Sequence, residues 1–85
     1  EEFVVILPDT ELDTAGVVAE RIRNRVAAEP FRLPDGQMLE RTVSVGIGAL
    51  QMPGDTVETI LKRADAALYD AKASGRNRVV AKAAA

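Results

Sequence analysis

Two groups of charged side chains in this chain could carry chemistry. Glu1 and Glu2 directly precede the apolar residues 3–7, and charges at the mouth of a buried strand need a partner or a metal ion. Such a carboxylate pair can hold magnesium or manganese near a phosphate. Lys72 and Arg76 stand near the expected end of a helix. They could act as a two-armed phosphate clamp, with Arg as a planar fork and Lys as a point charge.

Each group also has a simpler interpretation, and residue types and spacing alone favour it. Adjacent strand residues point to opposite faces, so Glu1 and Glu2 could be two solvated charges that block edge pairing. Lys and Arg at a helix C-terminus complement the helix dipole without any ligand. Asp65 and Tyr69 share a helical stripe with Lys72 and Arg76, and this stripe could simply face solvent.

The amino-acid composition excludes several kinds of metal site and catalysis for this chain. The 85 residues are 47% hydrophobic and 28% charged, with a net charge of −2, no Cys and no His. Zinc sites built from Cys and His, and catalysis by Ser-His or Cys-His pairs, are therefore excluded, and a metal would need oxygen ligands. No apolar stretch approaches the roughly 20 residues of a membrane span, and the acidic N-terminus is unlike a signal peptide. The composition fits a cytoplasmic protein and argues against coating of nucleic acid.

Hydrophobic patterns predict the elements that must position these groups. Residues 3–7 read as a central strand, and the repeat Val18, Ile22, Val26 predicts a helix over residues 12–28. A second helix should begin at a cap, Asp55 or Thr56, and stop at Gly75. The remaining expected elements are a hairpin of residues 31–33 and 38–42, a strand over 43–49 and a strand over 77–81.

This order predicts an α+β fold of the ferredoxin-like kind, with two helices on one face of a mostly antiparallel sheet. Gly46 and Gly48 share one face of their strand, where close helix packing is favoured over a bound ligand. The inward face of the second helix is expected to comprise Ile60, Leu61, Ala64, Leu68 and Ala71.

Four segments, in order along the chain, resemble the GGDEF domain of diguanylate cyclases. Residues 1–8 look like the second half of its Gly-Gly-(Asp/Glu)-Glu-Phe signature, cut after the two glycines. Residues 19–23 resemble the helix after the signature, and residues 42–48 resemble a later strand. Residues 63–79 match the closing helix almost completely. Residues 72–80 look most like the PleD-type response-regulator cyclases.

The resemblance implies a reaction and a set of site residues. A dimer of domains, each holding one GTP, would form cyclic di-GMP and two pyrophosphates with two Mg²⁺ or Mn²⁺ ions per site. Glu1 and Glu2 match the catalytic and metal-binding acids of the family. Lys72 and Arg76 match the pair that holds the GTP phosphates. Arg21 matches an arginine of the inhibitory product site, and Asp65 and Tyr69 match supporting positions.

The resemblance also implies that much of the domain is missing. Residues 1–85 would be the C-terminal portion of a single GGDEF domain, an incomplete nucleotidyl cyclase-like palm without its central strand, signature glycines, guanine-reading residues and remaining metal ligand. The parent protein would be an enzyme, whereas the fragment alone would be inactive and would self-associate through its unpaired first strand. The alternatives are a degenerate GGDEF domain that binds GTP or cyclic di-GMP without catalysis, and an unrelated ferredoxin-like module. No membrane contact is expected from this segment.

Overall fold

A computed structural model describes residues 10–83. The expected strand over residues 3–7 lies outside the described residues. The observed order is α1 (Leu12–Ala28), β1 (Phe31–Arg32), β2 (Met38–Leu39), β3 (Val45–Gly48), α2 (Val57–Ala73) and β4 (Val79–Lys82). Both predicted helices, the hairpin and the last two strands are confirmed, although the strands are shorter than expected. Neither helix of the described part is long and apolar enough to cross a membrane.

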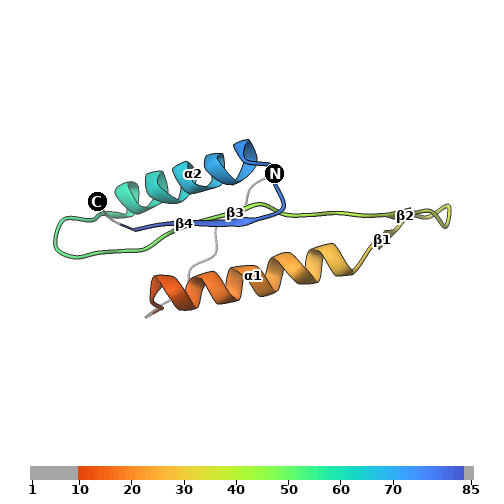
Figure 1. The fold of residues 1–85 in the computed structure, drawn as a ribbon, viewed down its shortest axis with the longest axis horizontal. Coiled ribbons are helices and arrows are strands. Elements are labelled where there is room, and N and C mark those ends of the chain that lie inside the picture. The colour runs from red at the N-terminus through yellow and green to blue at the C-terminus, as the bar shows by residue number, and fades with distance from the viewer. Residues whose placement is uncertain (1–9, 84–85) are drawn as a thin grey trace.

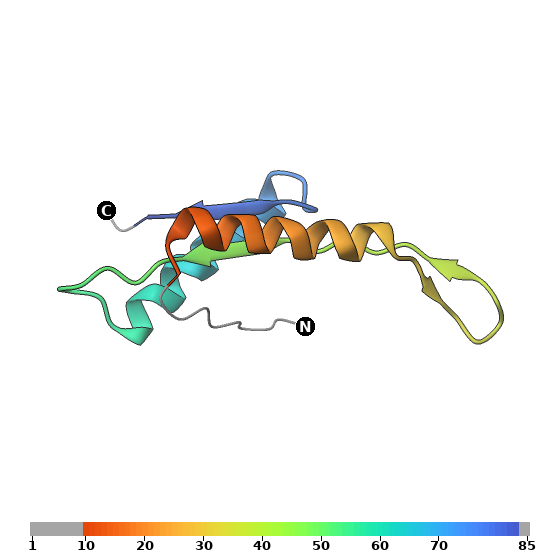
Figure 2. The ribbon, with the colours of Figure 1, turned by 90° about the horizontal axis from the view of Figure 1, so that it is seen from below.

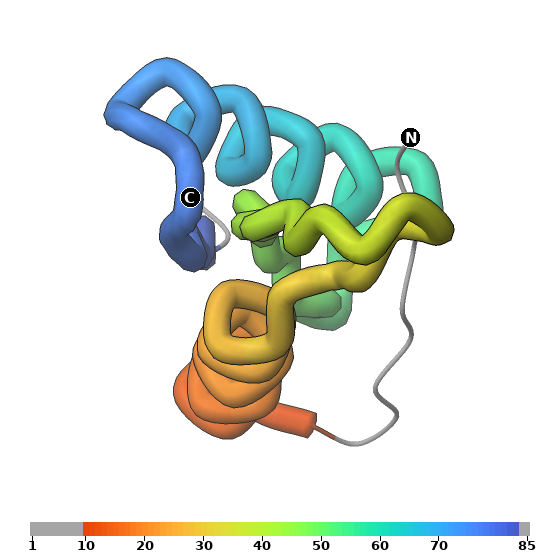
Figure 3. Tube along the Cα trace, turned by 90° about the vertical axis from the view of Figure 1, so that its right-hand side faces the viewer, coloured from red at the N-terminus to blue at the C-terminus, as the bar shows by residue number. Residues whose placement is uncertain are grey.

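The molecule has three layers, with the β3–β4 pair between the two helices (Figures 1 and 3). The α+β class is confirmed, but the expectation that both helices lie on one face of the sheet is wrong. Strands β3 and β4 pair in parallel, from Val45 opposite Val79 to Gly48 opposite Lys82. The chain leaves β3, returns through α2 and enters β4 in the same direction, as a βαβ unit requires. In the described residues, only the β1–β2 hairpin is antiparallel.

The hairpin projects beyond the layers, which makes the molecule 53 Å long (Figure 2). Its turn is set by Asp35, whose Oδ1 accepts from the Gln37 N–H at 3.0 Å, and by Gly36 with φ +89°. At the base of the hairpin, the guanidinium carbon of Arg41 lies 4.8 Å from the centre of the Phe31 ring. The hairpin thus depends on local contacts.

Small residues form the interfaces between the layers. The buried side chains of the described part are Ala15 and Ala19 on α1 and Ala67 and Ala71 on α2. A Cβ on Gly46 would lie 2.2 Å from the Leu68 backbone nitrogen, and one on Gly48 would lie 2.7 Å from the Ile60 carbonyl oxygen. The two glycines therefore let the α2 backbone touch β3, which confirms the prediction of close helix packing.

One member of the predicted inward face of α2 is wrong. Leu61 is 41% exposed, whereas Ala67, which the prediction omitted, is fully buried. Leu61 lies about 100° around the helix from Ile60, at the edge of the buried face. Ala67 lies near the centre of that face, where only a small side chain fits at this helix–strand distance.

Helix α2 begins with a capping box and an ion pair. The Thr56 and Thr59 side chains accept from each other's backbone N–H groups, at 3.2 and 2.8 Å, so Thr56 is the cap. Asp55 instead pairs with Arg63, two turns further along the chain in α2, through two hydrogen bonds of 2.8 and 2.9 Å. Arg63 also donates to the Ala49 carbonyl at 2.6 Å. This pair therefore ties the end of β3 to the start of α2.

The close approach of α2 to β3 predicts opposite effects for two glycine substitutions. Gly46→Ala should lower the free energy of unfolding by about 1–3 kcal/mol, because the new methyl group would overlap the α2 backbone. Gly16→Ala, in the second turn of α1, meets nothing within 4 Å and should raise the free energy of unfolding by roughly 0.5–1 kcal/mol. Urea denaturation of both variants measures this difference, and equal effects would contradict the packing described.

The Asp55–Arg63 pair predicts a dependence of stability on pH. The hydrogen bonds from Arg63, the Gln51 N–H and Thr59 hold the pKa of Asp55 far below its ordinary value of 3.8. Because the folded-state pKa is lowered, the contribution of Asp55 is complete above pH 3.8 and is lost as the pH falls further. Asp55→Asn should therefore lower the midpoint of thermal unfolding at pH 7, and the deficit should shrink as the pH falls below 3.8. A deficit that does not change with pH would refute this account.

Candidate functional site

The last turn of α2 carries the candidate phosphate clamp. The helix ends in a Schellman motif, with the Arg76 N–H bonded to the Ala71 carbonyl at 2.9 Å and the Gly75 N–H close to the Lys72 carbonyl at 3.5 Å. Gly75 has φ +125°, and a Cβ there would lie 2.6 Å from the Arg78 side chain. The sequence prediction that the helix stops at Gly75 is confirmed, and the turn that follows depends on glycine at this position.

Lys72 and Arg76 lie on either side of this turn. Lys72 is in the last turn of α2 and half-buried, whereas Arg76 lies beyond the helix and is exposed. The structure therefore brings both cations to the same end of α2. Since the dipole at a helix C-terminus repels anions, these side chains would have to supply the positive charge for a phosphate.

The backbone of Arg76 and Asn77 is strained. Both residues adopt the left-handed conformation, with φ +63° and +49°. This conformation costs about 1–2 kcal/mol for a residue with a Cβ, although Asn tolerates it better than Arg. Residues in such conformations persist when surrounding contacts hold them, and they are concentrated at functional sites.

Contacts from α1, from Ser44 and from the neighbouring Arg78 hold the strained turn. The Asn77 N–H donates to the Ser44 hydroxyl at 3.1 Å, and Arg78 Nε donates to the Arg76 carbonyl at 3.1 Å. Arg23, on α1, donates through Nη1 to Oδ1 of Asn77 at 2.8 Å. The hydroxyl, the guanidinium groups and the turn form one network around the backbone of Arg76.

Arg23 is itself held on the surface of α1. It pairs with Glu20 one turn earlier, and its Nη2 donates to Asn24 Oδ1 at 3.0 Å. The hydrogen bonds from Arg23 lower the pKa of Glu20, so this carboxylate stays ionised and pairs with the guanidinium. The composition of α1 did not distinguish Arg23 from its neighbours Arg21 and Arg25, because only the folded chain brings Asn77 within reach.

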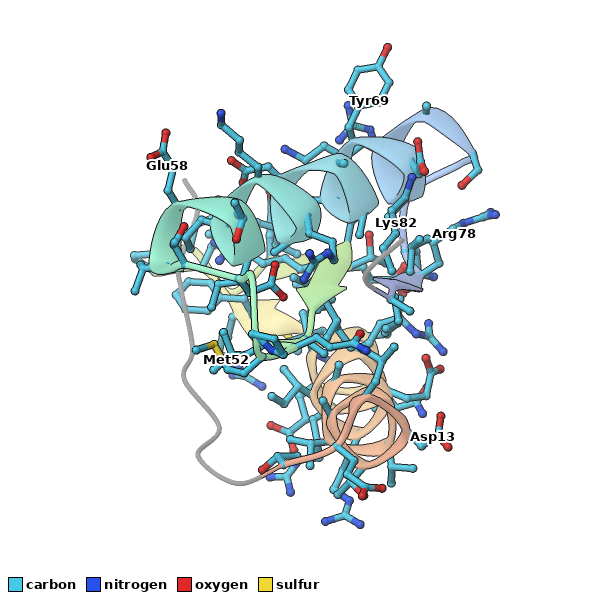
Figure 4. All side chains as sticks on the ribbon, turned by 90° about the vertical axis from the view of Figure 1, so that its left-hand side faces the viewer. Asp13, Met52, Glu58, Tyr69, Arg78 and Lys82 are labelled. Carbon is cyan, nitrogen blue, oxygen red and sulfur yellow. The ribbon has the colours of Figure 1, made fainter. Side chains whose placement is uncertain are left out.

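The other predicted site residues of the described part are exposed, two of them on α2 before Lys72 and one on α1. Tyr69 is 72% exposed and points away from the sheet (Figure 4), and Asp65 is exposed on α2. Arg21 is exposed on α1, the helix that lies on the other side of the β3–β4 pair from α2 (Figure 3). Glu1 and Glu2 lie outside the described residues. The structure thus groups Lys72 with Arg76 and places Arg21 elsewhere.

The residues that could hold a metal follow from the chemistry of the chain. Within residues 10–83, no three acidic side chains gather closely enough to hold a metal ion. The chain has neither His nor Cys, so carboxylates are its charged metal ligands. The Glu1–Glu2 pair has the oxygen donors that a hard divalent cation prefers and remains the predicted metal site.

Sequence reasoning missed two polar contacts at the ends of α2, the Asp55–Arg63 pair and the Arg23–Asn77 hydrogen bond. The first had a partial signal, because Asp55 was a candidate helix cap, but its partner lies eight residues away, outside the i,i+3 and i,i+4 spacings of helical pairs. The second joins residues 54 positions apart, and no local pattern predicts such a contact.

Comparisons with known proteins give the family. The profile described as "Diguanylate cyclase, GGDEF domain" matches residues 1–78. The chain is 56% identical to the response regulator PleD of Caulobacter vibrioides over 99% of its own length and 19% of that protein. It is 40% identical to diguanylate cyclase A of Treponema denticola over 93% of its own length and 21% of that protein. The chain thus spans about a fifth of these relatives.

Solved structures agree with the sequence matches. The GGDEF domain of DgcB from Caulobacter crescentus, solved in complex with c-di-GMP, superposes with a TM-score of 0.78 and 31% identity. This match covers 88% of the chain and 43% of that structure. The active GGEEF domain of a Vibrio cholerae diguanylate cyclase gives a TM-score of 0.73, 35% identity and coverage of 88% and 46%. The observed fold is therefore part of a nucleotidyl cyclase-like domain, and the chain belongs to the GGDEF domain family.

Proposed function

We propose that residues 1–85 are the C-terminal portion of a diguanylate cyclase domain, which condenses two GTP molecules into cyclic di-GMP and two pyrophosphates. The observation that carries this proposal is the pair Lys72 and Arg76 at the end of α2, next to a turn that Arg23 and Ser44 hold from two other segments of the chain. The coverage of less than half of the solved GGDEF structures supports a division of the site between this chain and upstream residues. This domain would bind GTP and would lie in the cytoplasm.

Lys72 and Arg76 would act on the triphosphate. The 3′-hydroxyl of each GTP attacks the α-phosphorus of the other and loses its proton to solvent, and at each phosphorus the bond to the leaving pyrophosphate breaks. The leaving pyrophosphate gains negative charge, which an ammonium group and a guanidinium group stabilise by charge-assisted hydrogen bonds. Because Arg76 can bind two oxygens in one plane, it would orient the phosphates as well as neutralise them.

Glu1 and Glu2 would serve the attacking oxygen. As carboxylates they could hold two Mg²⁺ or Mn²⁺ ions together with ligands from upstream residues. When bound, such ions would neutralise the phosphate charge and make the attacking hydroxyl more acidic. The other nucleotide must come from a second domain, so we propose that the active form is a homodimer. Arg21 would bind the product, cyclic di-GMP, at a separate inhibitory site.

The proposal predicts the loss of activity in two variants. In the full-length protein with GTP and Mg²⁺, Lys72→Ala and Arg76→Ala should each lower GTP affinity by about 10-fold or more, because each removes a charge-assisted hydrogen bond to phosphate. Formation of cyclic di-GMP, followed by chromatography, should fall at least as far. Residues 1–85 alone should form no product.

A matched control is Lys62→Ala, which removes an exposed lysine from α2 that pairs only loosely with Glu58, at 3.7 Å. It should leave GTP affinity and turnover unchanged. If the folded full-length protein binds GTP without forming product, the domain is a binding module and the enzyme proposal fails.

Arg21→Ala gives a separate prediction for the product site. This variant should form cyclic di-GMP at the normal initial rate, because Arg21 lies on α1, whereas Lys72 and Arg76 lie at the end of α2. Its inhibition by added cyclic di-GMP should weaken by about 10-fold, as expected for the loss of one charged hydrogen bond. Unchanged inhibition would remove Arg21 from the product site.

A further inference from the structure

We infer that Arg23 and Asn77 form a positioning contact that holds the turn at residues 75–77 and so sets the place of Arg76. The inference about nucleotide binding rests on the proposed function. The inference about the turn rests on the structure alone. Neither residue is proposed to touch the nucleotide.

The turn at residues 75–77 needs support from outside the helix end. Arg76 and Asn77 are consecutive left-handed residues, and Arg76 has no conformational preference for this region. The Schellman hydrogen bonds end at Arg76, so they do not secure Asn77. Asn77 is held instead through its backbone N–H, which donates to the Ser44 hydroxyl, and through its side-chain Oδ1, which accepts from Arg23.

The orientation of the Arg23 side chain is already restricted before it contacts Asn77. Its side chain is 19% exposed, which is far less than the 75% of Arg25 on the same helix. Nε donates to Glu20 Oε1 at 2.9 Å, which leaves Nη1 directed at Asn77. Nη1 also lies 3.5 Å from the Asn77 carbonyl oxygen. The guanidinium thus joins α1 to the turn with its orientation already restricted, which reduces the entropy lost on forming the contact.

The contact between Arg23 and Asn77 affects the position of Arg76. Asn77 is its direct neighbour, so rotation of the Asn77 backbone would redirect the Arg76 backbone and the side chain that it carries. Loss of the Arg23 contact should therefore allow the turn to sample other conformations while α2 stays packed on β3 through Gly46 and Gly48. Binding of a phosphate would then first require the turn to be ordered again.

Hydrogen exchange without nucleotide tests the contact itself. In the full-length protein, Arg23→Ala and Asn77→Ala should speed exchange of the Arg76 and Asn77 amides by about 10-fold, while amides in the middle of α2 keep their protection. Asn77→Asp keeps an acceptor for Arg23 and tolerates the left-handed conformation, so it should keep the protection. Lys62→Ala should also leave it unchanged. Unchanged exchange in Arg23→Ala, or a loss spread evenly over α2, would overturn the inference.

A double-mutant cycle tests the link to Arg76. Arg23→Ala should weaken GTP binding by about 5- to 10-fold in the otherwise unchanged full-length protein. In an Arg76→Ala background the same substitution should change the affinity by less than about 2-fold, because it acts through a side chain that is already gone. A purely structural role for Arg23 would produce equal losses in both backgrounds and would overturn the link.

The two failures can be told apart. If the unsubstituted protein does not bind GTP, the proposed function fails. The exchange measurement uses no nucleotide, so it would still decide whether Arg23 and Asn77 hold the turn.

Discussion

The contact between the backbone of α2 and β3 determines the geometry of the rest of the structure. It exists because Gly46 and Gly48 present no side chain to the helix, so the α2 backbone lies where a Cβ would be. Ala67 and Ala71 complete the interface because they are small. Because α2 packs on β3 in this way, the position of its C-terminal end, and therefore of Lys72, can vary little.

Polar contacts then secure the two ends of the helix. At the start, Arg63 joins Asp55 and the Ala49 carbonyl, so the loop from β3 cannot separate from α2 without breaking an ion pair. At the end, Arg23 reaches across from α1 to Asn77. The apolar interface sets the distance between the layers, whereas the polar contacts hold the segments that enter and leave the helix. The candidate site lies at the second of these ends.

Much of this arrangement could be predicted from local patterns. The helix over residues 12–28, the stop at Gly75 and the close approach at the two glycines follow from periodicity and from the special backbone of glycine. The inward face of α2 was predicted in part, because helical periodicity fixes a direction but not the depth to which each side chain is buried. The prediction that both helices lie on one face of the sheet was wrong. The order of helices and strands along the chain does not by itself fix the face of the sheet on which each helix packs.

The family and the residue types of the candidate site follow from the sequence alone. The motifs at residues 1–8, 19–23, 42–48 and 63–79 are local, and carboxylate, ammonium and guanidinium groups have the same chemistry in any fold. The contact between α1 and the turn after α2, by contrast, is visible only in the folded chain. Arg21, Arg23 and Arg25 are chemically identical, and Arg23 differs only because folding brings a residue 54 positions away within 2.8 Å of its guanidinium. Contacts between distant segments depend on the packing of whole elements, which no local pattern encodes.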